Sequence, residues 1–271
     1  MPRDKDYILG THDAEIERLG LQHRVWRPRV LDAWRRAGFN VGQTILDVGC
    51  GPGYATLDLA EMVGPTGQIL AVDRSERFLA SLDATCRARG IENVHIYEQD
   101  LDHAELPRLD VDGAWCRWVM AFVRHPKRLL ERIRARVRPG GKLVVHEYID
   151  YSTWRTAPVC PEIEEFVEVV MKSWRADGGE PDIGLQLPSW LNELDFEITA
   201  LKPIIDIVPV SSYVWQWPKA FIDVGLRRLV ELNLMTPGHA KEVTEAFARI
   251  EATPSALMIT PAVIEIIAVR R

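Results

Sequence analysis

A glycine-rich turn between an apolar run and a helical pattern is the strongest chemical signal in this sequence. The apolar residues Ile45, Leu46 and Val48 are followed by Gly49-Cys50-Gly51-Pro52-Gly53, and a helical period begins near residue 54. Glycine allows a sharp turn and leaves no Cβ between the backbone and a ligand. The first amides of the next helix carry partial positive charge. The loop therefore favours a nucleotide-type cofactor, although glycine-rich loops also occur as simple tight turns.

Two acidic residues follow the loop at positions that suit a nucleoside. Asp73 ends the apolar run 69–73, and Asp100-Leu101 follows the next run. An acid at a strand end can accept both hydroxyls of a ribose, and Asp100 with Leu101 suits an adenine. Because Tyr54 replaces the third glycine of G-x-G-x-x-G, adenosine is favoured over NAD. The simpler alternatives are that Asp73 caps the next helix and that Asp102 competes with Asp100.

Short apolar runs alternate with helical periods through the middle of the chain. Runs that are apolar on both faces and separated by helices are typical of a parallel sheet covered on both sides. The predicted strands are residues 44–48, 68–72, 94–97, 111–116 and 142–147, and the predicted helices between them are 54–63, 75–89 and 126–137. The sequence thus predicts a three-layer, doubly wound α/β fold.

The segments on either side of this core have a different pattern. The first forty residues are predicted to form two helical segments, one beginning at Asp13 and one ending at Gly38. Beyond residue 150 we predict helices at 161–174, 218–234 and 237–251 and strands at 196–210 and 257–269. The predicted organisation is therefore an N-terminal cap segment (1–40), a cofactor-binding core (41–150), and a region (151–271) of lid helices with the last two strands.

Composition narrows the classes of function. The 271 residues are 47% hydrophobic and 27% charged, as in globular proteins, and the net charge of −6 arises in residues 151–271. The basic run between Arg124 and Arg138 is typical of a solvated helix face, so no nucleic-acid partner is expected. No apolar stretch is long enough to span a membrane. Four scattered cysteines indicate neither disulfides nor a metal site, and we expect a cytoplasmic protein.

Taken together, the motifs resemble class I S-adenosylmethionine-dependent methyltransferases of the small-molecule type. The similarity covers about residues 40–148 in the family's order. Its elements are the loop at 47–53, Asp73, Asp100-Leu101, the fourth-strand segment 114–119 and the segment 137–143. Residues 7–22 are also similar to the N-terminal segment of some small-molecule members. No Asn/Asp-Pro-Pro-Tyr motif follows the fourth strand, which disfavours N-methylation of adenine or glutamine.

The resemblance implies a seven-stranded sheet with an antiparallel last strand and a defined cofactor site. Gly49 and Gly51 would contact the methionine part and the ribose, Asp73 the ribose hydroxyls, and Asp100 the adenine amino group. The full set of implied cofactor-binding residues is Tyr7, Gln22, Gly49, Gly51, Asp73, Arg74, Asp100, Leu101, Cys116 and Arg117. In this set Arg74 and Leu101 would flank the adenine, and Cys116 and Arg117 would line the methionine end.

The acceptor side is less defined by sequence. Ligands of open α/β sheets lie beyond the carboxyl ends of the strands, where His146, Glu147 and Tyr148 stand. His146 is the best candidate general base, because histidine titrates at about pH 6.5. The alternative is a hydrogen-bonded structural histidine, and His12 and His125 are weaker candidates for the base. A methyl group on a sulfonium is already activated, so alignment of the acceptor can suffice without a base.

Nine tryptophans are many for a chain of this length. Aromatic rings suit a flat or cationic acceptor, and Trp118, Tyr148, Trp215 and Trp217 are the candidates for a substrate pocket. The alternative is ordinary core packing, which is favoured for Trp174 on its helical stripe.

The predicted function is transfer of a methyl group from S-adenosylmethionine to N, O or C of a small-molecule acceptor, which leaves S-adenosylhomocysteine. The helical cap would enclose that acceptor. Two other classes remain open: a nicotinamide-dependent oxidoreductase, and a non-catalytic methyltransferase-like interaction module. The sequence does not indicate the oligomeric state.

Overall fold

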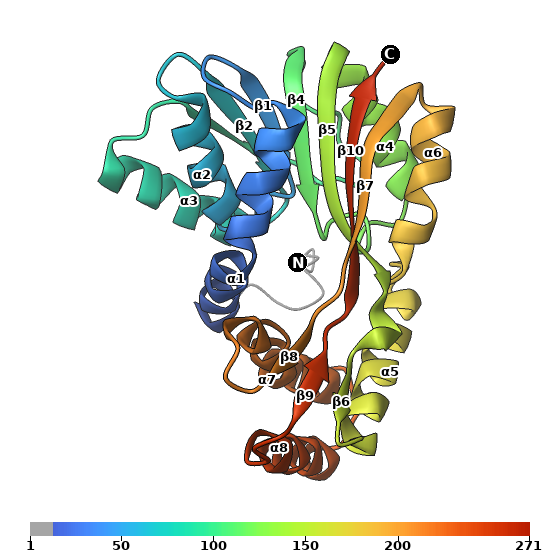
Figure 1. Cartoon of the computed structure of the whole chain (residues 1–271). Helices are drawn as coiled ribbons and strands as arrows, with labels where there is room; N and C mark the ends of the chain where they lie inside the picture. Colours follow the sequence, from blue (N-terminus) through green and yellow to red (C-terminus); the bar gives the residue numbers. More distant parts are fainter. Residues whose placement is uncertain (1–12) are drawn as a thin grey trace.

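The computed structural model describes residues 13–271 and is built on one mixed, seven-stranded sheet (Figure 1). The order across the sheet is β3-β2-β1-β4-β5-β10-β7. The strands are β1 (Thr44–Val48), β2 (Gln68–Asp73), β3 (Val94–Glu98), β4 (Val111–Arg117), β5 (Val137–Asp150), β7 (Phe196–Ile204) and β10 (Ala262–Arg270). Strands β1 to β5 pair in parallel, whereas β10 is antiparallel to both β5 and β7. The prediction of a seven-stranded sheet with an antiparallel last strand is confirmed.

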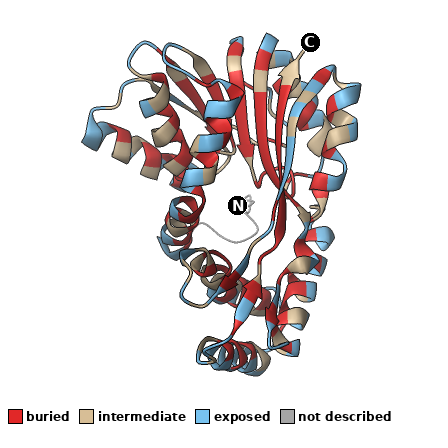
Figure 2. Ribbon diagram, in the orientation of Figure 1, coloured by how far each residue is buried: buried red, intermediate tan, exposed pale blue. Residues whose placement is uncertain are grey.

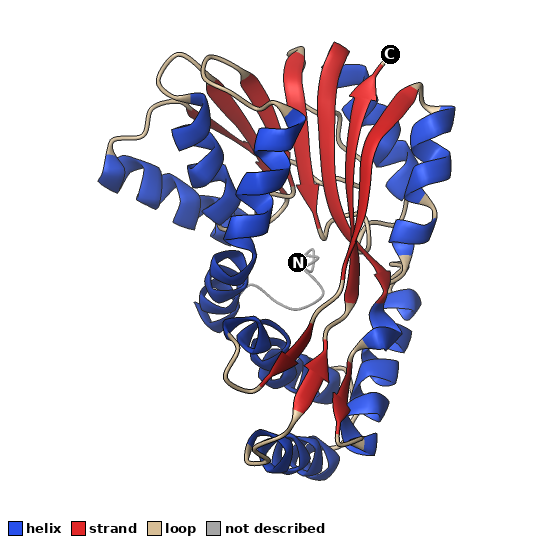
Figure 3. Cartoon of the chain, in the orientation of Figure 1, coloured by secondary structure: helices blue, strands red, loops and turns tan. Residues whose placement is uncertain are grey.

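Helices cover both faces of the sheet, which gives the three predicted layers (Figure 3). One face carries α1 (Asp13–Ala37), α2 (Tyr54–Val63) and α3 (Glu76–Arg89), and the other carries α4 (Pro126–Arg136) and α6 (Leu187–Glu193). The central strands of the sheet are mostly buried, shown red in Figure 2, whereas the edge strands β3 and β7 are largely intermediate or exposed. The helix α6 was not predicted, because seven residues are too few to establish a helical period.

The N-terminal helix differs from the expectation of two segments. It is a single helix of 25 residues that continues through Pro28. Proline interrupts a helical hydrogen bond, but Trp26, Val30 and Trp34 on either side are fully buried and hold the helix against the core. In Figure 1 this helix runs from the sheet down to α7 (Gln216–Glu231), and the two helices pack together.

The far end of the molecule is a cap of helices around a second, small sheet. The two strands predicted at 196–210 and 257–269 each divide into two. Their outer parts, β8 (Ile207–Pro209) and β9 (Leu257–Ile259), form a three-stranded sheet with β6 (Arg155–Ala157). Around it pack α5 (Pro161–Ala176), α7 and α8 (Pro237–Glu251). No helix of the described residues is long and apolar enough to cross a membrane.

Candidate functional site: two adjoining cavities

The larger cavity lies at the carboxyl ends of β1, β2 and β4, where ligands of open α/β sheets bind. Its empty volume is about 1000 Å³, including its mouth. Of the predicted cofactor-binding residues, those that line it are Gln22, Gly49, Gly51, Asp73, Arg74, Asp100, Leu101 and Arg117. Tyr7 lies outside the described residues. One cavity thus brings together eight residues that stand on α1 and on or shortly after four separate strands.

The glycine loop forms the floor of this cavity. Gly49 and Gly51 have φ angles of +69° and +54°, in the left-handed region that favours glycine. A Cβ on Gly49 would lie 2.3 Å from Cγ2 of Val119, so the loop packs tightly there. A Cβ on Gly51 would meet nothing within 4 Å. The backbone at Gly51 is therefore open to a ligand, while Gly49 is fixed against the loop that follows β4.

Asp73 ties the end of β2 to the glycine loop. Its Oδ2 accepts a hydrogen bond from the amide of Gly51 at 2.8 Å, and its Oδ1 accepts one from Ser75 at 2.9 Å. The helix cap of α3 is the side chain of Ser75, which accepts from the amide of Phe78. Burial raises the pKa of the Asp73 carboxyl above its usual value. Each oxygen retains a further lone pair, so Asp73 can still accept from a ribose hydroxyl.

The end of β3 supplies the second acid. Oδ1 of Asp100 accepts from the amide of Asp102 at 2.9 Å, and Asp102 in turn accepts from the amide of Arg124. Both aspartates line the cavity, together with the buried side chain of Leu101. The Asp100 carboxylate is thereby fixed in orientation beside an apolar wall, which suits a flat ring with an amino group.

Arg117, at the end of β4, is a cation deep in this cavity. Its Nη2 lies 3.3 Å from Nδ1 of His23, and Nε2 of His23 lies 3.0 Å from Oδ2 of Asp58. Its Nη1 is buried and has no partner among the described residues. Burial lowers the pKa of Arg117 to about 10, so the guanidinium is charged at neutral pH. A buried guanidinium nitrogen without a partner is suited to a ligand carboxylate.

Two cavity-lining polar residues were not predicted from sequence. His23 lies on α1 and reaches Arg117 only because that helix folds over the sheet. Asp47 lies within the motif at 47–53, but no role was assigned to it. It is fully buried and accepts from Thr56 Oγ1 at 2.6 Å, and burial raises its pKa to about 7. An acidic residue two positions before the first glycine was the one sequence signal for it.

The prediction for Cys116 is not supported by its position. Side chains alternate along a strand, and Trp115 and Arg117 take the face that lines the cavity. Cys116 faces the opposite side of the sheet, where it is buried with the residues that pack against α4 and α6. Its thiol therefore does not line the larger cavity in the described structure.

The prediction of His146 as a general base is wrong in geometry. Its ring is fully buried, lies against Trp26 and Trp115, and lines neither cavity of the described structure. Its Nε2 lies 3.0 Å from Oε2 of Glu265, and burial lowers its pKa. Alternation does point His146 toward the α1 side of the sheet, but Trp26 of α1 covers it. The structural alternative is the correct one.

A smaller cavity adjoins the first and has a largely aromatic wall. Its empty volume is about 380 Å³, and it shares Gln22, Trp118 and Phe122 with the larger one. Its further lining residues are Arg18, Tyr148, Tyr151, Trp154, Trp174, Trp217, Pro218, Phe221 and Pro261. We call this space the aromatic chamber. Three of the four predicted substrate residues line it.

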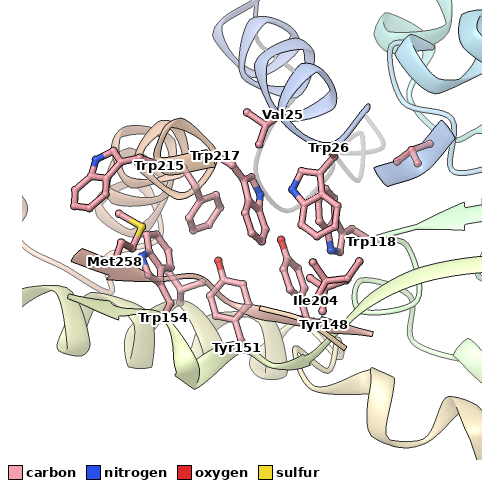
Figure 4. Packing of buried hydrophobic residues seen from close by; sticks show 14 of the residues in the cluster. Val25, Trp26, Trp118, Tyr148, Tyr151, Trp154, Ile204, Trp215, Trp217 and Met258 are labelled. Atoms are coloured by element: carbon pink, nitrogen blue, oxygen red, sulfur yellow. The ribbon is translucent and has the colours of Figure 1, made fainter. Parts of the chain in front are cut away.

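Three rings of the chamber are stacked. Trp118 lies nearly parallel to Tyr148 and to Trp217, with centroid distances of 5.4 and 5.6 Å and interplanar angles of 17° and 15°. Figure 4 shows these rings between α1, α7 and the end of β5, with both labelled tyrosine hydroxyls directed toward the helices. Trp215 is the exception among the predicted residues, because it packs on Phe247 and donates to Glu251 at 3.0 Å within the cap.

Glu147 holds the loop that carries Trp118. Its Oε1 accepts from the amides of Val119 and Met120 at 2.7 and 2.8 Å. Trp118 has a φ of +51°, which is strained for a bulky side chain. The carboxylate therefore stabilises the turn in which this strained residue points between Tyr148 and Trp217. Burial raises the pKa of Glu147 to about 7.

Comparison with known proteins agrees with this geometry. Residues 45–141 match a family model described as a methyltransferase domain. A demethylmenaquinone methyltransferase of Lactococcus lactis is 28% identical over 126 residues, which cover 46% of this chain and 49% of that protein. The chain spans half or less of the length of the first such relatives, so the match concerns the domain.

Two solved structures show the fold beyond that domain. A methyltransferase from Geobacter sulfurreducens in complex with S-adenosyl-L-homocysteine has a TM-score of 0.52 at 18% identity, covering 90% of this chain and 91% of that one. The cyclase SpnF has a TM-score of 0.58, also at 18% identity, covering 90% and 80%. Likeness at this level shows the fold alone.

The sheet order, the glycine loop and the family match together define the class. The protein carries a class I, Rossmann-like methyltransferase domain, a class whose cofactor is S-adenosylmethionine.

Proposed function

We propose that this protein transfers a methyl group from S-adenosylmethionine to a small-molecule acceptor. The observation that carries the proposal is the junction of two unlike cavities: one lined by the glycine loop, two aspartates and Arg117, the other by aromatic rings. The first cavity carries groups that suit the ribose, the adenine and the amino-acid part of an adenosyl amino acid. The second is the space into which a methyl group at the far end of that ligand would face.

The residues of the larger cavity fit the cofactor in chemistry. Asp73 accepts from the ribose hydroxyls, and Asp100 accepts from the adenine amino group while Leu101 and Arg74 flank the ring. The unpartnered Nη1 of Arg117 pairs with the carboxylate of the methionine part. Bound S-adenosylmethionine supplies an electrophilic methyl group on a sulfonium, and S-adenosylhomocysteine remains after transfer.

The protein's contribution to the reaction is alignment. Among the described residues lining the aromatic chamber there is no histidine, aspartate or glutamate that could serve as a general base. The walls instead hold the acceptor in line with the sulfur and exclude water. Chamber walls contributed by α1, α5 and α7 suit a small molecule, and the four free, buried cysteines are compatible with a cytoplasmic setting.

Three alternatives to methyl transfer are compatible with the fold or with the larger cavity. SpnF, a cyclase, has this fold, so the fold by itself does not establish methyl transfer. A nicotinamide cofactor is another, since the larger cavity is suited to any adenosine. A non-catalytic module would retain the domain without an acceptor.

The test is thermal unfolding with S-adenosylmethionine, S-adenosylhomocysteine or NAD, for wild type and Asp73→Asn. A ligand at about 100 times its Kd adds roughly 2.7 kcal/mol, which raises Tm by about 5–10 °C for a chain of this size. We expect that shift with the two adenosyl ligands and a smaller one in Asp73→Asn. The matched control is Asp83→Asn, an exposed aspartate of α3. A shift with NAD alone would refute the proposal.

A further inference from the structure

The aromatic chamber carries information about the acceptor. We propose that the acceptor is a flat, conjugated ring compound, uncharged or anionic, whose oxygen atom accepts a hydrogen bond from Gln22 at the junction of the two cavities. This inference rests on the proposed function, because it names the substrate class of the same site. Three features of the chamber carry it: its rings, its charges and its one directed donor.

The rings fix the shape of the ligand. Tyr148 and Trp217 each stack on Trp118, at interplanar angles of 17° and 15°, so the three rings form one aligned aromatic wall. The empty volume of about 380 Å³ includes space open to solvent, so the alignment of the rings and not the size of the chamber indicates the ligand. A flat ring that lies against this aromatic wall is stabilised by offset stacking.

The charges disfavour a cationic acceptor. No carboxylate is found among the described residues that line the chamber. Two of its rings already face guanidinium groups: Arg18 lies 5.7 Å from the centroid of Phe221, and Arg117 lies 5.1 Å from that of Trp118. Aromatic faces attract cations, but these two are already engaged by arginine. An ammonium ligand would find no carboxylate among these described lining residues, and an unpaired charge is costly in a buried site.

The directed donor is the amide of Gln22. Its Oε1 accepts from Arg18 Nη1 at 2.9 Å, and Arg18 is held in turn by Glu15 at 2.6 and 2.7 Å. Because guanidinium has only donors, this bond fixes the amide with its NH₂ group away from Arg18. That nitrogen makes no hydrogen bond to a described residue, although Gln22 is only 7% exposed.

The position of Gln22 determines what the donor can contact. It is one of three residues that line both cavities, and it is the only one of the three with a side-chain amide. Glu15, Arg18 and Gln22 occupy one face of α1 at helical spacing, so the orientation of the amide is set by the helix itself. An oxygen of the acceptor placed there can accept a hydrogen bond from this amide nitrogen.

The experiment measures binding of two probes of equal ring size by calorimetry, with S-adenosylhomocysteine saturating. The probes are 2-naphthol and 2-naphthyl-trimethylammonium. We expect wild type to bind the naphthol at least tenfold more tightly. Gln22→Leu should weaken naphthol binding about fivefold to tenfold, as loss of one hydrogen bond predicts, and leave the ammonium unchanged. The matched control is Gln186→Leu, at an exposed glutamine remote from both cavities.

Each result decides the matter. Equal or tighter binding of the ammonium, or a Gln22→Leu variant that behaves like Gln186→Leu, would overturn the proposal. Trp217→Leu should weaken naphthol binding as well, which shows that the probe occupies the chamber. If S-adenosylhomocysteine itself does not bind, the proposed function fails. The same titrations without it still test the preference of the chamber for the naphthol.

Discussion

The two cavities of this protein meet at Gln22, Trp118 and Phe122, yet they are built in opposite ways. The larger cavity combines apolar walls with charged side chains and is assembled mainly from residues within or directly after strands. Its backbone conformations are dictated by glycines with positive φ, and its acids are tied down by backbone amides. Each part lies within a short, continuous stretch of sequence.

The aromatic chamber draws on segments far apart in the chain. Its rings come from the loop after β4, the end of β5, the helices α5 and α7, and η1 (Tyr151–Thr153). Only Trp118 has an unusual backbone, and a buried carboxylate stabilises it. The comparison indicates that the cofactor site depends on local backbone geometry, whereas the acceptor site depends on how the cap packs on the sheet.

Substitution of the loop glycines should have the largest effect and should separate its two roles. Gly49→Ala places a Cβ against Val119 and strains the backbone, so we expect a loss of about 2–5 kcal/mol in the free energy of unfolding. Gly51→Ala meets no atom within 4 Å and should cost only about 1–2 kcal/mol. Denaturant unfolding measures both.

The same pair should differ in ligand binding. Because the Cβ of Gly51→Ala projects into open space beside the cofactor, this variant should fold but bind S-adenosylhomocysteine at least tenfold more weakly. A Gly51→Ala protein that binds the ligand normally would contradict the contact of this glycine with the cofactor.

Trp217→Leu should affect the chamber and spare the cofactor. The smaller side chain opens the stack with Trp118, and we expect a loss of about 2–4 kcal/mol in stability and at least tenfold in methyl transfer. Binding of S-adenosylhomocysteine should stay within about twofold of wild type. A matched loss of both would show that the two cavities are one site, and Trp215→Leu in the cap controls for general destabilisation.

This contrast also explains what sequence could and could not predict. The strands, the glycine loop, Asp73 and Asp100 were predictable because each depends on neighbours in the chain. The burial of the His146 ring was not predictable, because Trp26, which covers it, lies 120 residues earlier in the chain. Likewise, nothing near Trp215 or Trp217 in sequence tells which of them faces the chamber, because both are buried and only α7 and α8 packing decides it.

Glu147→Gln should change the pH dependence of stability. The pKa of Glu147 is raised to about 7 from its ordinary value of 4.5, so the folded protein holds a proton that the unfolded chain releases. Stability is therefore greatest below about pH 4.5 and falls as pH rises to about 7, by at most about 3 kcal/mol.

Glutamine keeps an oxygen for the two backbone amides but does not ionise. The variant should therefore gain stability relative to wild type as pH rises from 5 to 8, measured by unfolding at each pH. Asp47, whose pKa is also raised to about 7, contributes equally to both proteins and cancels in the difference. A difference that does not vary with pH would show that Glu147 ionises normally.

His146→Asn should have the smallest effect on the reaction. The imidazole contacts Glu265 and two tryptophans but neither cavity, so we expect a loss of about 1–3 kcal/mol in stability and a kcat within about threefold of wild type. The pH profile of kcat should keep its shape. If the fall of kcat at low pH were present in wild type and absent in the variant, His146 would be the catalytic base.

The most direct test of the two-cavity account is a crystal structure with S-adenosylhomocysteine bound. The account predicts the ribose hydroxyls within hydrogen-bond distance of Asp73, the carboxylate at Nη1 of Arg117, and the sulfur at the junction beside Gln22 and Trp118, with the aromatic chamber free of ligand. A ligand whose adenosine or amino-acid part lies among the rings of Tyr148, Trp174 and Trp217 would contradict it.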